Sequence, residues 1–126
     1  MRARAFRQGA VTVVLFDAAT TQSKALRAEA LKAFKRDLKD QGPSYDSFHV
    51  CIWIEGYRRG RRLDVDNVAK ASLDALVGLV WRDDRQVTRL CVEKLTAGPD
   101  QVVVAATPTA LGEESEALAS LLQDLA

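Results

Sequence analysis

The sequence predicts an α+β fold, a small mixed β-sheet with helices packed against it in the order β-α-β-α-β-β-α. Two observations favour it: apolar runs rich in β-branched residues predict short strands, and two segments with apolar residues every three or four positions predict helices between them. A length of 126 residues suits a single domain, residues 1–126. The hydrophobic fraction of 48% and charged fraction of 28% are those of an ordinary globular chain.

The first half of the chain supplies one strand and one helix. Residues 10–16 are apolar and mostly β-branched, which predicts a buried strand. Residues 23–38 follow a helical period, and their expected apolar stripe contains Leu31, Phe34 and Leu38. A glycine and a proline at 42 and 43 then predict the end of this helical region.

The second half predicts three more strands and a helix. Residues 47–55 alternate between apolar and mixed positions, as a strand with one buried face does. Residues 64–77 form a clear amphipathic helix. Residues 86–94 and 101–106 are expected to be two strands, and the turn-forming residues 96–100 between them predict a hairpin.

Charge is unevenly distributed along the chain. All 18 Lys and Arg residues lie before residue 111, whereas four of the 17 acidic residues lie after it, in a predicted helix at about 113–125. No apolar stretch approaches the roughly 20 residues that a membrane span needs, and the N-terminus lacks the features of a signal peptide. We therefore expect a cytoplasmic protein, with Cys51 and Cys91 as buried thiols rather than a disulfide.

Acidic residues are concentrated around the second helix. Asp64 and Asp66 flank one residue at its beginning, and Asp84 follows its end. Mg²⁺ prefers carboxylate oxygens and waters, and it can activate water and offset charge in phosphodiester cleavage. Lys70 lies one helical turn after Asp66, where an ammonium group could hold a phosphate.

Each of these residues also has an ordinary structural interpretation. Asp64 or Asp66 could cap the helix, and Asp66 with Lys70 could be an exposed ion pair worth about 0.3–0.5 kcal/mol. Asp83 and Asp84 could belong to a plain turn. A capping role needs only one acid, so the joint pattern favours chemistry more than any single residue does.

A longer motif carries a specific resemblance. Residues 63–84 read LDVDNVAKASLDALVGLVWRDD, followed by Gln86-Val87 and by Val92-Glu93-Lys94. Residues 61–94 resemble the signature of RusA-type Holliday junction resolvases without a gap. The stretch 17–23 departs from that family, whose members usually carry a Pro-, Lys- and Arg-rich segment there.

The resemblance implies a RusA-like fold and a homodimeric endonuclease that cuts four-way DNA junctions by paired nicks, in DNA recombination and repair. It implies Mg²⁺ as the cofactor, with Mn²⁺ as the expected substitute. By position, Asp64, Asp66 and Asp84 would be the metal-binding catalytic acids and Lys70 the catalytic lysine. Asp74 could hold that lysine in place or be a solvated helix acid.

Four arginines lead directly into the acidic segment: Arg58, Arg59, Arg61 and Arg62. Basic side chains beside carboxylates can draw DNA towards a site that would otherwise repel it, so we expect these residues to bind DNA. The alternative is a solvated loop.

Other function classes remain open at this point. A nuclease on the same fold could prefer flaps, forks or duplex DNA, and a DNA-binding or assembly protein could keep the fold without cutting. A divalent cation could also have a purely structural role. A site based on histidine is disfavoured, because His49 is the single histidine and lies in a predicted strand.

Overall fold

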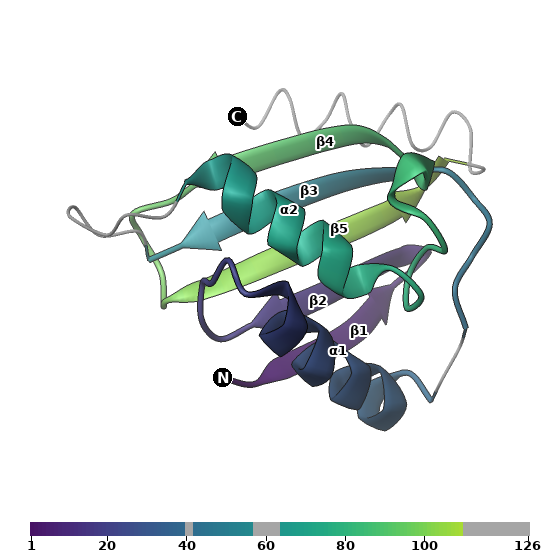
Figure 1. Ribbon diagram of the computed structural model, residues 1–126, viewed down its shortest axis with the longest axis horizontal. Helices are drawn as coiled ribbons and strands as arrows, with labels where there is room; N and C mark the ends of the chain where they lie inside the picture. Colours follow the sequence, from purple (N-terminus) through teal and green to yellow (C-terminus); the bar gives the residue numbers. More distant parts are fainter. Residues whose placement is uncertain (40–41, 57–63, 110–126) are drawn as a thin grey trace.

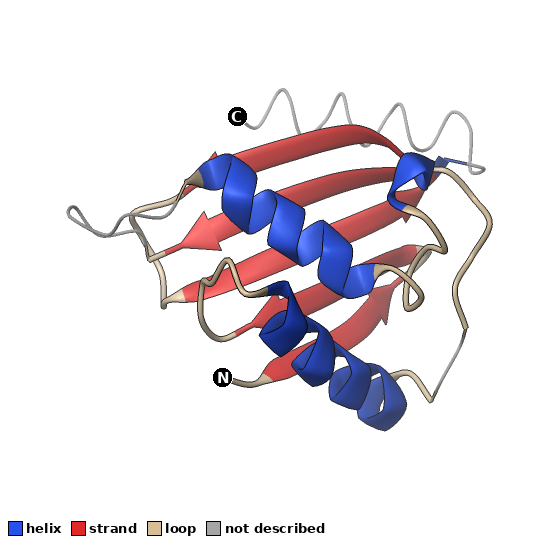
Figure 2. Cartoon of the chain, viewed as in Figure 1, coloured by secondary structure: helices blue, strands red, loops and turns tan. Residues whose placement is uncertain are grey.

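The computed structural model describes residues 1–39, 42–56 and 64–109. The elements there are β1 (Ala3–Gln8), β2 (Val11–Phe16), α1 (Ser23–Asp37), β3 (Phe48–Glu55), α2 (Val65–Leu76), a 3₁₀ turn η1 (Asp84–Gln86), β4 (Val87–Lys94) and β5 (Gln101–Pro108). The five strands form one mixed sheet, and both helices pack on the same face of it (Figures 1 and 2). The predicted α+β fold is confirmed.

The strand order across the sheet is β1-β2-β5-β3-β4. Only β3 and β4 are parallel, and the other neighbouring pairs are antiparallel. The helix α2 connects the two parallel strands, as a crossover between parallel neighbours requires. It therefore runs back in the direction opposite to both strands, and its first turn follows the end of β3.

The predicted hairpin between the last two strands is wrong. β5 pairs with β2 and β3, and β3 separates it from β4. Burial explains this order: β5 carries buried residues at alternate positions and only partly exposed ones between them, whereas β4 is mostly exposed and suits a sheet edge. The connection crosses the end of β3 at Gly56, where a Cβ would lie 2.8 Å from the carbonyl oxygen of Pro99.

The strand β1 is absent from the sequence prediction. Its residues alternate between buried Ala3 and Ala5 and exposed Arg4, Phe6 and Gln8. Alanine and arginine are weak strand formers, so the composition of this segment obscured its period-two pattern. The tight turn at Gly9, which has a φ of 61°, joins β1 to β2 in an antiparallel hairpin. The described order is therefore β-β-α-β-α-β-β.

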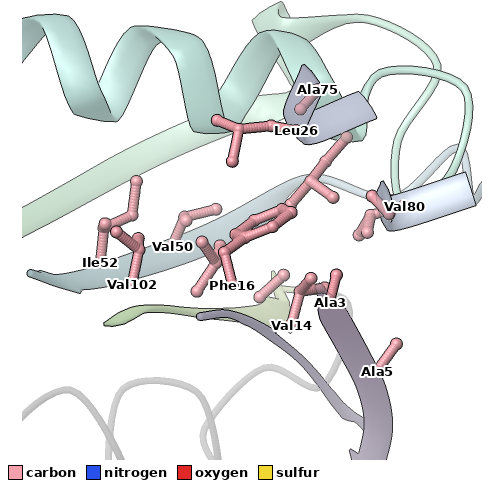
Figure 3. Packing of buried hydrophobic residues seen from close by; sticks show 14 of the residues in the cluster. Ala3, Ala5, Val14, Phe16, Leu26, Val50, Ile52, Ala75, Val80 and Val102 are labelled. Carbon is pink, nitrogen blue, oxygen red and sulfur yellow. The ribbon is translucent and has the colours of Figure 1, made fainter. Parts of the chain in front are cut away.

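The core lies between the sheet and the two helices (Figure 3). Phe16 is fully buried at its centre, with Val50 and Val102 from the sheet and Leu26 from α1 among the neighbouring labelled side chains. Buried alanines on both helices, such as Ala30 of α1, let these helices approach closely. The core thus fixes α2 over the strands that carry the second half of the sequence motif.

Two further expectations are corrected. Leu31 does not belong to the apolar stripe of α1, because it is 41% exposed; the buried face consists of Leu26, Ala30, Ala33 and Phe34, with Leu38 following the helix. Cys91 is not buried but exposed on the edge strand β4. Cys51 is partly buried, and both cysteines are free thiols, as expected.

Two predictions lie outside the described residues: the helix at 113–125 and the arginine segment that contains residues 58–62. Among the described helices, none is long and apolar enough to cross a membrane.

Candidate active site

A groove between α2 and β4 brings together three of the four predicted catalytic residues. Asp66, Lys70 and Asp84 line it, together with Asp74. Its volume is about 500 Å³, and its apolar lining consists of Val65, Ala69, Leu73, Leu90 and Val92. The described part of the chain therefore places an ammonium group and three carboxylates on one open surface.

The fourth predicted residue, Asp64, directly precedes α2 at the N-cap position. Its side chain makes no capping hydrogen bond to the helix, so the capping interpretation does not hold for Asp64. Instead, Asn67 contacts both aspartates: its side-chain amide donates to Asp64 Oδ2 at 3.3 Å, and its backbone N–H donates to Asp66 Oδ1 at 3.0 Å. Asn67 thereby orients the two carboxylates of the Asp-Val-Asp sequence.

Lys70 and the acids on α2 share one face of the helix. Asp66, Lys70 and Asp74 follow one another at intervals of four residues, which puts them about one helical turn apart on the groove side. Within the ranges that the structure describes, Lys70 forms no ion pair with either aspartate, so neither the surface pair nor the proposed support by Asp74 is seen. Lys70 is exposed on this face.

Asp84 reaches the groove from its other end. Since α2 runs opposite to β4, the first turn of α2 lies near the end of β4 that carries Val92, whereas Asp84 begins the turn η1 that leads into the other end of β4. The chain folds back to bring Asp66 and Asp84 to one groove. Among the described residues, however, no three His, Cys, Asp or Glu side chains lie close enough together to hold a metal ion.

Asp83 has a structural role beside Asp84. Its side chain accepts a hydrogen bond from the backbone N–H of Arg85 at 2.9 Å and pairs with the Arg85 guanidinium at 3.1 Å. Hydrogen bonds from the Arg85 side chain and then from its backbone lower the pKa of Asp83 to about 2. Asp83 caps the turn η1 in a reciprocal arrangement with Gln86, and this fixes the backbone on either side of Asp84.

The lowered pKa of Asp83 gives a pH dependence. A carboxyl whose pKa is lower in the folded state stabilises the fold above its ordinary pKa of 3.8, and this contribution is lost as the pH falls towards about 2. Asp83→Asn should therefore melt below the wild type at pH 7, and the two melting temperatures should converge near pH 2. Thermal melts monitored by circular dichroism test this; an equal gap at both pH values would contradict it.

Gln86 uses all of its side-chain hydrogen-bonding groups, a role that the sequence reasoning missed. Its Oε1 accepts from the backbone N–H of Arg82 at 2.8 Å and of Asp83 at 3.0 Å. Its Nε2 donates to the carbonyl oxygens of Ser44 at 2.9 Å and Asp46 at 2.7 Å. One amide thus joins the segment before β3 to the turn that carries Asp84. The signal for it was only the glutamine two positions after an Asp-Asp pair.

Gln86→Leu is expected to lower the free energy of unfolding by about 2 kcal/mol, because four hydrogen bonds are lost and their backbone partners are left without the amide. Urea denaturation measures this difference. Gln8→Leu, at an exposed position of β1, is the matched control and should change stability by less than about 0.5 kcal/mol. Equal effects of the two substitutions would show that the Gln86 network contributes nothing.

One comparison with known proteins identifies a family. A family model described as endodeoxyribonuclease RusA matches residues 10–106, which include β2 to most of β5 and every described residue of the groove. A search of curated proteins gave no match. The matched range covers most of the 126 residues. This chain belongs to the RusA family of endodeoxyribonucleases.

Proposed function

We propose that this protein resolves four-way DNA junctions by Mg²⁺-dependent, paired and symmetric nicks in DNA recombination and repair. The observation that carries the proposal is the RusA family match, together with a groove that gathers Asp66, Lys70 and Asp84 from the motif typical of that family. A pure DNA-binding protein would gain nothing from several carboxylates along a DNA-binding groove, because they repel phosphates.

The residues present fit a divalent cation in the kind of donor that they offer. Asp64, Asp66 and Asp84 supply hard carboxylate oxygens, and all three are exposed. None forms an ion pair with a Lys or Arg that the structure describes. Their charges repel one another, and a bound cation would offset that repulsion. We propose these three acids as its ligands, with Mn²⁺ able to replace Mg²⁺.

Each residue of the groove then has a defined task. A bound Mg²⁺ would supply an activated water and offset charge on the phosphate and on the departing oxygen. Lys70 holds a phosphate oxygen from one turn further along α2, and Asn67 orients Asp64 and Asp66.

We further propose that the protein is a homodimer, since a junction has approximate two-fold symmetry and needs two symmetric cuts. Arg58, Arg59, Arg61 and Arg62 are proposed to bind the DNA backbone beside the groove. The cytoplasm is the proposed location. The single domain of residues 1–126 also belongs to this proposal.

A panel of labelled substrates tests the proposed activity. A synthetic four-way junction, a matched flap, a matched fork and a linear duplex are incubated with the protein in Mg²⁺, Mn²⁺ or EDTA. We expect cutting of the junction alone, in both metals and not in EDTA. Cutting of flaps or forks instead of the junction would show that the protein prefers those structures. Binding without cutting in either metal would favour a DNA-binding protein on the same fold.

Asp84 can be tested separately as a metal ligand. Because it lies at the other end of the groove from Asp66, loss of its charge tells whether the two acids bind one ion. We expect Asp84→Asn to weaken Mn²⁺ binding by about tenfold, measured by electron paramagnetic resonance of free Mn²⁺. Unchanged Mn²⁺ affinity combined with lost cleavage would assign Asp84 a role on the DNA rather than on the metal.

A further inference from the structure

An exposed tyrosine lies on the segment that Gln86 ties to the Asp84 turn. Tyr45 is 77% exposed, more than the other exposed large apolar side chains of the described residues, which lie between 41% and 46%. The guanidinium carbon of Arg82 lies 4.0 Å from the centre of the Tyr45 ring. One face of the ring therefore carries a cation, and the high exposure leaves the rest of the ring open to solvent.

Hydrogen bonds hold the backbone on both sides of Tyr45 in place. Gln86 Nε2 donates to the carbonyl oxygens on both sides of Tyr45, those of Ser44 and Asp46. The same segment is anchored by the Ser44 N–H, which donates to the carbonyl oxygen of Val80 at 3.0 Å. Gln86 Oε1 accepts from the backbone of Arg82, so one amide fixes both partners of the stack. Figure 1 shows the segment before β3 and the turn before β4 at the same end of the sheet.

The pair lies next to the proposed site of cleavage. Arg82 is two residues before Asp84, and Asp83 between them caps the turn η1. Arg82 forms no ion pair with an acid that the structure describes, so its charge is not neutralised within this part of the protein. An exposed cation–π contact is worth only about 0.5–1 kcal/mol, so the stack alone gives little reason to hold an aromatic ring in water.

We propose that Tyr45 and Arg82 form a stacking platform for a nucleobase whose face is exposed at the branch point of the DNA that is cut beside Asp84. A base in an intact duplex has both faces covered by its neighbours, whereas a base at a branch point can expose one. The aromatic ring offers a flat apolar surface to that face, and the guanidinium adds attraction for the adjacent phosphate. The inference rests on the proposed function, since it names how branched DNA would be recognised near the groove.

DNA binding measured without cleavage tests the platform. Fluorescence anisotropy in EDTA gives the affinity of the protein for a four-way junction and for a linear duplex of the same sequence. Tyr45→Ala should weaken junction binding by about tenfold and duplex binding by less than about twofold. Tyr45→Phe keeps the ring and should bind both DNAs as the wild type does. Phe6→Ala, which removes an exposed ring on β1, is the matched control and should bind the junction normally.

A base analogue gives a second readout. With 2-aminopurine at the branch point, the wild type and Tyr45→Phe should change its fluorescence on binding through stacking, and Tyr45→Ala should not. Wild-type affinity of Tyr45→Ala for the junction would overturn the platform, as would an equal loss of affinity for duplex DNA. If the wild type shows Tyr45-dependent binding but cuts nothing, the cleavage proposal falls and the platform stands. If it binds no DNA, both fall.

Discussion

Replacing Asp66 with Asn is expected to lower the rate of Mg²⁺-dependent junction cleavage by about a thousandfold. Asp66 lines the groove from the first turn of α2, and one of its oxygens is already oriented by the Asn67 N–H. An amide has nearly the same shape but no charge, so the substitution removes a proposed metal ligand with little effect on packing. Single-turnover cleavage of a labelled junction measures the rate, and anisotropy in EDTA should give unchanged or slightly tighter DNA binding.

Asp74→Asn is the matched control for this result. Asp74 lies two turns further along the same helix, is exposed and lines the same groove. If the lost negative charge acted only through general electrostatics, the cleavage rates of both variants would fall equally. Loss of a metal ligand should lower the cleavage rate of Asp66→Asn alone. We expect Asp74→Asn to cleave within about threefold of the wild-type rate. A mild effect of Asp66→Asn would remove this residue from the chemistry.

The largest effect on stability is expected at Trp81. Its side chain is 0% exposed, and its ring lies 5.7 Å from that of Phe48 at an angle of 57°. Trp81→Ala should therefore lower the free energy of unfolding by about 3–5 kcal/mol, a large share of the 5–15 kcal/mol typical of such domains. Urea denaturation at pH 7 measures the loss.

Trp81→Phe separates the ring from its polar atom. The indole N–H of Trp81 is buried with no hydrogen-bond acceptor among the described residues, so removing it leaves no partner unpaired. Phenylalanine keeps an aromatic ring beside Phe48, and we expect a loss below about 1.5 kcal/mol. If Trp81→Phe were as unstable as Trp81→Ala, the indole N–H would have to contribute through a contact that the described residues do not provide.

The sequence was most informative where the local pattern decides the structure. The helical period of 64–77 correctly predicts α2, and the alternation in 47–55 predicts the buried face of β3, because each element buries one side against the core. Strand order could not be read in the same way. The hairpin prediction between 86–94 and 101–106 failed because strand pairing depends on which strand needs burial on both faces. The turn-rich loop between these strands passes the end of β3, so β3 lies between β4 and β5 in the sheet.

The candidate site was likewise predictable only where a local pattern or motif marks its residues. Spacing alone placed Asp66 and Lys70 on one helical face, and the motif pointed to Asp84, all of which line the groove. The part played by Gln86 depends on carbonyl groups about 40 residues earlier in the chain, which no local pattern reveals. Tyr45 had no motif around it, and only its exposure and its contact with Arg82 distinguish it.

The most direct test of the central claim uses a supercoiled plasmid with an inverted repeat that extrudes a cruciform. Two symmetric cuts across the cruciform's four-way junction linearise the plasmid within one binding event, whereas a single nick only relaxes it. We expect linear product from the start of the reaction in Mg²⁺, with both ends at the cruciform and none in EDTA. Relaxed circles without linear product, or cuts spread over the plasmid, would contradict junction resolution by paired nicks.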